Sequence, residues 1–89
     1  MDQKIVNKEE IIENVKEFII NNFLFGDNSQ APKGDDSFME LGIIDSTGIL
    51  EVINHIESQY SIAVNDDELV PENLDSLNNI AVFVLNKLK

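Results

Sequence analysis

The sequence contains no cysteine, no tryptophan and no arginine among its 89 residues. The absence of cysteine excludes disulfide bonds, thiolate metal sites and a cysteine nucleophile. Without such cross-links, the free energy of folding must come from the packing of apolar side chains. Hydrophobic residues make up 43% of the chain, which is enough for one modest core, so we expect a single domain over residues 1–89.

Positive charge is also scarce, because six lysines face seventeen acidic residues and the formal net charge at pH 7 is −11. Phosphate backbones repel such a surface, which argues against nucleic acid as a partner. The same charge argues against an anionic membrane surface. We expect partners with basic patches, bound through contacts that weaken as salt rises. The alternative is that the acidic residues only keep a small protein in solution.

Long apolar runs are missing as well. No run reaches the roughly 18 residues that are needed to cross a bilayer. The first residues are charged and lack the apolar stretch of a signal peptide. We therefore expect a cytoplasmic protein without membrane insertion.

Three segments place apolar residues at three- and four-residue steps, which is the pattern of amphipathic helices. They span about residues 8–24, 45–60 and 75–88. Before the last segment, Pro71 limits any helix to a short piece near 66–70 that re-enters before residue 75. The predicted fold class is all-α, a four-helix bundle with three long helices, a short third helix and a long first loop.

The first loop, over residues 25–44, is long for so small a domain. Its first half is rich in turn-forming residues, and its second half returns to apolar ones. We expect the apolar half to pin the loop to the core. The side chains expected to do so are those of Phe38, Met39, Leu41, Ile43 and Ile44.

The sequence offers only weak candidates for a catalytic or a metal-binding site. The single histidine, His55, lies nine residues after Ser46, and on one helix this spacing puts them on opposite faces about 13 Å apart along the axis. They cannot act as a nucleophile and its base within one chain. The loop after Asp27 fails the calcium-loop spacing, because Pro32 and Phe38 stand where glycine and glutamate belong. The sequence predicts neither an enzyme nor a metal site.

Asp45 and Ser46 stand where the second long helix begins. Either residue can cap that helix, an interaction worth about 0.5–2 kcal/mol. If Asp45 is the cap, a phosphodiester on Ser46 would meet free backbone N–H groups and the positive end of the helix dipole. Physical chemistry alone leaves three alternatives open: an unmodified cap, phosphorylation, or a larger group attached through phosphate.

The stretch "LGIIDSTGILEVINHIE", residues 41–57, resembles the region of acyl and peptidyl carrier proteins that holds the phosphopantetheine arm. Leu41, Gly42, Asp45 and Ser46 match the "LG-x-x-DS" of that family, and its preceding phenylalanine is present at position 38. The order of helices is similar over roughly Glu9 to Leu88. The resemblance implies a four-helix bundle of the acyl-carrier-protein type.

The resemblance further implies a carrier with no catalysis of its own. A phosphopantetheinyl transferase would join the arm of coenzyme A to Ser46, and the arm's thiol would hold acyl groups as thioesters. Asp45 would contact the magnesium of the transferase and fix the helix start. The positions that would meet partner enzymes are Thr47, Glu51, Asn54 and Glu57.

Thr47 and Gly48 depart from the fatty-acid carriers, which usually have leucine and often an acid there. "DSTG" looks more like carriers served by stand-alone adenylating ligases, including aminoacyl and D-alanyl carriers, or like specialised polyketide carriers. We expect a monomer that also meets acyl-transferring or condensing enzymes in a fatty-acid, polyketide, nonribosomal-peptide or D-alanylation pathway. The rival hypothesis is an acidic helical adaptor that binds a basic partner without a prosthetic group.

Overall fold

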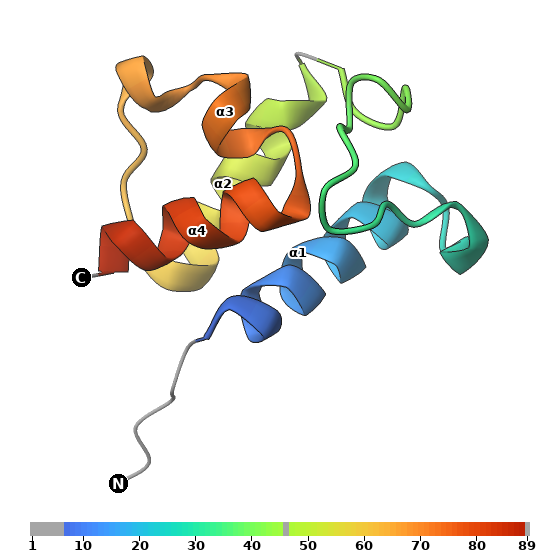
Figure 1. Cartoon of the computed structure of the whole chain (residues 1–89), viewed down its shortest axis with the longest axis horizontal. Coiled ribbons are helices and arrows are strands. Elements are labelled where there is room, and N and C mark those ends of the chain that lie inside the picture. The colour runs from blue at the N-terminus through green and yellow to red at the C-terminus, as the bar shows by residue number, and fades with distance from the viewer. Residues whose placement is uncertain (1–6, 46, 89) are drawn as a thin grey trace, which may run out of the picture.

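The computed structural model describes residues 7–45 and 47–88, and these residues form helices and loops without a strand (Figure 1). The predicted all-α fold, with three long helices, a short third helix and a long first loop, is confirmed. The α-helices are α1 (Lys8–Phe23), α2 (Gly48–Tyr60), α3 (Pro71–Leu74) and α4 (Leu77–Leu88), and 3₁₀ turns lie at Asn28–Gln30 and Asp66–Glu68.

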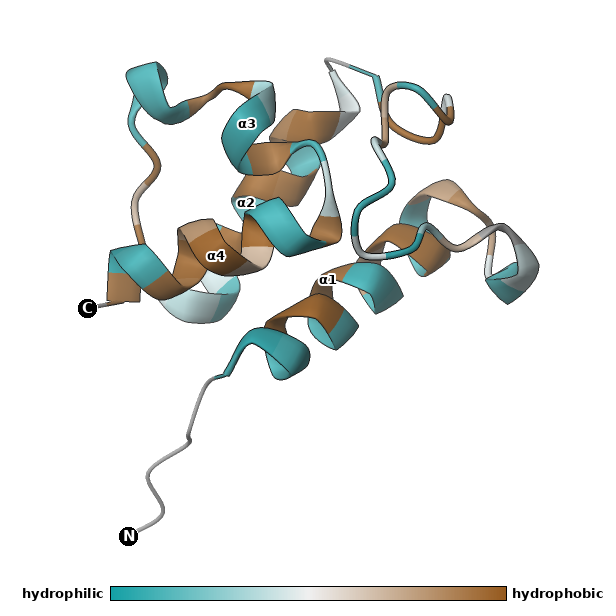
Figure 2. Ribbon diagram, in the orientation of Figure 1, coloured by the Kyte–Doolittle hydropathy of each residue, from teal (hydrophilic) through white to brown (hydrophobic). Residues whose placement is uncertain are grey.

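Helix α4 is central to the packing, because it contacts α1, α2 and α3. Figure 2 shows hydrophobic and hydrophilic residues alternating along α1 and α4, as the amphipathic pattern requires. Burial of one large apolar side chain contributes about 1.5–3 kcal/mol, so these contacts dominate the stability of the bundle. The side chains with no exposed surface include those of Ile11, Val15, Ile19, Phe38, Val52, Ile56, Ile80 and Val84.

The ends of α1 agree with the prediction to within one residue. The Asn7 side chain accepts a hydrogen bond from the backbone N–H of Glu10 at 2.8 Å, which makes Asn7 the N-cap. At the other end, Gly26 has a φ of +82°, and its N–H donates to the carbonyl of Ile20 at 2.8 Å. The left-handed backbone at Phe25 and Gly26 thus ends the helix.

Helices α2 and α4 begin two or three residues later than the first residue that the sequence pattern suggested. The capping residues themselves lie outside the helices. At α4, for example, the hydroxyl of Ser76 accepts from the N–H of Asn79 at 3.1 Å, and its carbonyl accepts from the N–H of Ile80 at 3.0 Å. Ser76 is therefore the cap, and the helix proper starts at Leu77.

The long loop is pinned to the core, but by fewer side chains than predicted. Phe38 and Ile44 are buried and Ile43 is half-buried. Met39 and Leu41 remain 47% and 52% exposed, so the prediction was wrong for these two. Residues 37–43 form one tight turn, and such a turn directs only some of its side chains inward.

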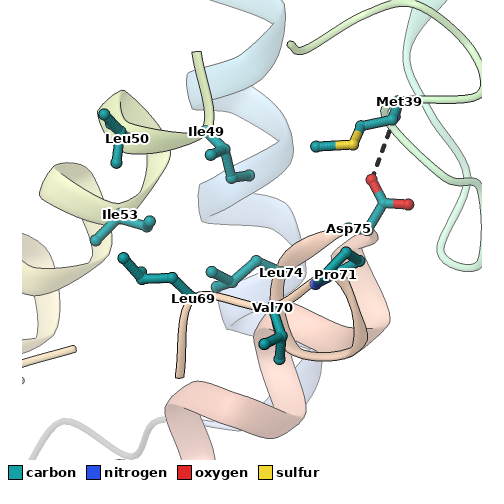
Figure 3. A pocket seen from close by; sticks show the side chains of 9 residues that line it. All are labelled: Met39, Ile49, Leu50, Ile53, Leu69, Val70, Pro71, Leu74 and Asp75. Carbon is teal, nitrogen blue, oxygen red and sulfur yellow. Dashed lines mark hydrogen bonds between the residues drawn. The ribbon is translucent and has the colours of Figure 1, made fainter. Parts of the chain in front are cut away.

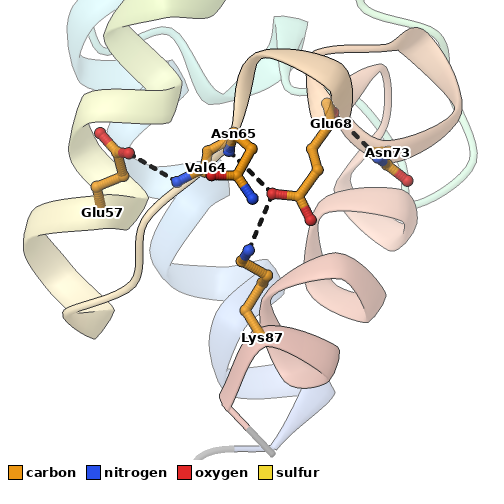
Figure 4. A network of polar contacts seen from close by, with 6 residues as sticks. All are labelled: Glu57, Val64, Asn65, Glu68, Asn73 and Lys87. Atoms are coloured by element: carbon orange, nitrogen blue, oxygen red, sulfur yellow. Dashed lines mark hydrogen bonds and ion pairs between the residues drawn. The ribbon is translucent and has the colours of Figure 1, made fainter.

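The connection between α2 and α3 is held by polar contacts (Figure 4). The carboxylate of Glu68 accepts from the N–H of Asn65 and from the ammonium group of Lys87, each at 2.9 Å. These contacts, first the Asn65 hydrogen bond and then Lys87, hold the pKa of Glu68 below its ordinary value. Nearby, the carboxylate of Glu57 accepts from the N–H of Val64 at 2.9 Å. The connection is thus fastened to both α2 and α4.

Within residues 7–45 and 47–88, no helix combines the length and the hydrophobicity that a bilayer crossing requires.

Candidate attachment site at the start of helix α2

Ser46, the predicted attachment residue, lies outside the residues that the structure describes, so the site is defined by its neighbours. Asp45 and Thr47 stand on either side of it, and both are exposed. The Oδ1 atom of Asp45 accepts from the N–H of Gly48 at 2.6 Å, and its carbonyl accepts from the N–H of Ile49 at 3.0 Å. These are the two hydrogen bonds of a helix N-cap, so Asp45 caps the start of α2.

Gly48 is a crowded position at this helix start. A Cβ atom built on it would lie 2.9 Å from the Cε1 atom of Phe23 and 3.1 Å from the Cγ2 atom of Ile44. Both distances are shorter than a comfortable carbon–carbon contact. Gly48 therefore lets the first turn of α2 approach the last residue of α1. The sequence pattern showed Gly48 only as a departure from fatty-acid carriers and gave no sign of this contact.

The four predicted partner-binding residues are not equivalent. Thr47, Glu51 and Asn54 are exposed, and their spacing of four and three residues places them on one face of α2. Glu57 is half-buried, and its carboxylate is engaged with the N–H of Val64. An acidic and polar face therefore runs along α2 from the predicted attachment position, and its last member, Glu57, also has a structural role.

His55 belongs to the contact between α1 and α2. Its ring stacks on that of Phe18 with centroids 4.1 Å apart and planes 18° apart, and its Nε2 atom lies 2.6 Å from the Oδ1 atom of Asn14. Burial lowers the pKa of His55 below its ordinary value. Among the described residues, no group of three or more histidine or acidic side chains is arranged to hold a metal ion.

An apolar groove of about 270 Å³ lies between α2 and α3, near the capped helix start (Figure 3). Figure 3 shows the Met39 side chain reaching from the loop toward Ile49 of α2. The sequence analysis missed the groove, because its walls come from three segments that are far apart in the chain. The residues that line it are Met39, Ile49, Leu50, Ile53, Leu69, Val70, Pro71, Leu74 and Asp75.

A second, more polar hollow of about 340 Å³ includes the two residues that flank Ser46 in sequence, Asp45 and Thr47. Phe23 and Glu51 also line it. The first turns of α2 thus border both an apolar groove and a more polar hollow.

Comparison with known protein families shows the family of the chain. It matches the family described as the phosphopantetheine attachment site over residues 25–84, which is more than half of its length. A search of curated proteins found no match. The matched range contains the loop, the capped start of α2 and most of α4. The chain therefore belongs to the phosphopantetheine attachment family, whose members are carriers rather than enzymes and hold the group covalently for use by partner enzymes.

Proposed function

We propose that the protein is a discrete acyl or aminoacyl carrier, a single domain over residues 1–89, and that Ser46 holds the phosphopantetheine arm. The observation that carries the proposal is the capped start of α2 inside the family match. There, Asp45 and Thr47 flank the serine in sequence and are both exposed, so a modifying enzyme has access to this part of the surface.

The chemistry of the neighbouring residues fits such a group. When bound, the arm supplies a thiol, which a chain without cysteine lacks. The start of a helix favours a phosphodiester through its free N–H groups and its dipole. Asp45 uses Oδ1 for the cap, and we assign Oδ2 to the contact with the magnesium of the phosphopantetheinyl transferase.

The surface of α2 supports transient binding of partner enzymes. Thr47, Glu51 and Asn54 offer exposed polar groups on one face, and the net charge of −11 favours partners with basic patches. Contacts of this kind form rapidly and weaken with salt, which suits a protein that must leave each enzyme in turn. Glu57 adds charge to this face while its carboxylate stays fixed to the connection after α2.

The cargo we propose is a thioester-linked acyl or aminoacyl group, loaded by an adenylating ligase and passed to acyl-transferring or condensing enzymes. The pathway is of the fatty-acid, polyketide, nonribosomal-peptide or D-alanylation type, in the cytoplasm. The apolar groove beside Ile49 and Leu50 supports a cargo with an alkyl portion. The acidic surface and the lysine-poor composition also support a monomer that avoids nucleic acid and membranes.

Intact-mass measurement tests the proposal. The protein is incubated with coenzyme A and a broad-specificity phosphopantetheinyl transferase, and we expect the mass gain of one arm. Ser46→Ala should abolish the gain, whereas the neighbouring Thr47→Ala should retain it. If the wild-type chain gains no mass while the same transferase modifies a second carrier in the same tube, the acidic adaptor without a prosthetic group is the better explanation.

A further inference from the structure

Residues 37–43, here called the Phe38 turn, form a compact unit before the attachment site. The N–H of Leu41 donates to the carbonyl of Ser37, and the N–H of Ile43 donates to the carbonyl of Phe38, each at 3.0 Å. Gly42 has a φ of +71°, a conformation that side chains with a Cβ rarely adopt. The turn is therefore joined by its own hydrogen bonds and anchored to the core by the fully buried Phe38.

A single residue at the end of α3 clasps this turn. The carbonyl of Asp75 accepts from the N–H of Phe38 at 3.0 Å. Its Oδ1 atom accepts from the N–H of Met39 at 3.2 Å, the dashed contact in Figure 3, and its Oδ2 atom accepts from the hydroxyl of Ser37. Asp75 is itself fixed, because its N–H donates to the carbonyl of Pro71 at 2.9 Å. Three successive residues of the loop are thus held by one residue of the opposite wall.

Two features of the site depend on where the Phe38 turn stands. Only the buried Ile44 separates the turn from Asp45, the cap of α2. The turn also carries Met39, which forms a wall of the groove together with Asp75. A shift of the turn would therefore displace both the helix start and the groove wall.

We propose that Asp75 is a positioning residue for the attachment site. By holding the Phe38 turn through its three hydrogen bonds, Asp75 fixes the positions of the start of α2 and of the Met39 side chain in the groove wall. The part of this inference that concerns loading rests on the proposed attachment at Ser46. The part that concerns the clasp does not, because it involves only contacts within the unmodified protein.

Nuclear magnetic resonance of the unmodified protein tests the clasp. Asp75→Ala should shift the ε-methyl signal of Met39 and the amide signal of Gly48, while signals from the middle of α1 stay in place. Asp75→Asn should give smaller shifts, because an amide oxygen still accepts from Met39 and the amide nitrogen donates to Ser37 instead of accepting. Glu72→Gln is the matched control, since it removes one charge from the same short helix and should shift neither signal.

Loading kinetics separate positioning from stability. Asp75→Ala should lower kcat for transfer of the arm by roughly ten- to a hundredfold, because a small misplacement of a reacting group has an effect of that order. KM should stay near the wild-type value, since the exposed face of α2 is unchanged. A variant that is only less stable would instead raise the apparent KM, because fewer molecules are folded, and would leave kcat unchanged.

The two experiments test separate parts of the proposal, the contacts of Asp75 and their role in loading. Unshifted Met39 and Gly48 signals in both Asp75 variants would overturn the clasp, and an unchanged kcat would overturn its role in loading. If Asp75→Ala does not fold, Asp75→Asn and Ser37→Ala decide, because each disturbs fewer of the three contacts. If the wild type is never loaded, the proposed function fails, whereas the spectra still decide whether Asp75 sets the helix start.

Discussion

The side of the bundle where α1 packs on α4 differs from the side where α2 faces α3 across the groove. On the first side, apolar residues such as Val15 and Ile80 have no exposed surface. On the second, Met39, Leu50 and Leu69 remain 47%, 50% and 39% exposed although they line one groove. A domain of this size needs most of its apolar side chains for its core. Apolar side chains that stay exposed in a groove therefore indicate that the groove side has a role other than stability. The first side supplies stability, and the second is the side where we propose that cargo and partner enzymes bind.

We expect the largest effect on the free energy of unfolding when a core residue is truncated, in contrast to a groove residue. Ile80→Ala should lower the free energy of unfolding by about 2–5 kcal/mol, because it leaves a cavity between α4 and its neighbours. Leu50→Ala should lower it by less than about 1 kcal/mol, since half of that side chain already meets water. Urea denaturation of the two variants measures both values. Equal losses would show that the groove side is as much a part of the core as the other side.

A substitution of Gly48, which lies against the last residue of α1, should have an intermediate effect on stability. Gly48→Ala forces a Cβ atom against Phe23, and overpacking of this kind costs about 1–3 kcal/mol. The gain in helix propensity from alanine is at most about 1 kcal/mol, so we expect a net loss of stability.

A double-mutant cycle checks the cause of that loss. Phe23→Ala removes the ring that the new methyl group meets, so Gly48→Ala should be less harmful in that background than in the wild type. Independent, additive losses from the two changes would place the crowding elsewhere.

The smallest expected effect is a pH dependence that belongs to the contact between α1 and α2. Burial lowers the pKa of His55 below its ordinary value of 6.5, so the unfolded chain binds a proton more readily than the folded one. The stability that the neutral ring contributes is therefore complete above pH 6.5 and is lost as the pH falls through that value toward the folded pKa.

Melting temperatures between pH 7.5 and about 5.5 measure this dependence, since most carboxylates titrate below that range. His55→Phe keeps a ring to stack on Phe18 and removes the titrating group, so its melting temperature should change less with pH over the same range. A variant that follows the wild-type profile would exclude His55 as the source.

Local sequence patterns were sufficient for most of the architecture. The ends of α1 and the break at Pro71 are set by residues within one or two turns in sequence, so the span of about residues 8–24 and the short helix before residue 75 were predictable. Apolar periodicity likewise identified the helices, because each helix has one face turned to the core.

Most of the features that the sequence did not reveal depend on residues far apart in the chain. In the sequence, Asp75 marks only the expected start of the last helix, and its contacts with the Phe38 turn come from more than thirty residues away. The Gly48–Phe23 contact likewise joins residues that are far apart in the chain. Periodicity predicts which face of an element is apolar, but not which distant residue meets it.

The contact between Glu68 and Lys87 has a practical consequence for handling the protein. It fixes the segment just before Leu69, a wall of the groove, to the last turn of α4. Shortening the chain ahead of Lys87 would leave the serine and its helix intact while releasing that wall. Affinity tags are therefore better placed ahead of α1, or after α4 behind a flexible spacer that leaves the lysine side chain free to fold back.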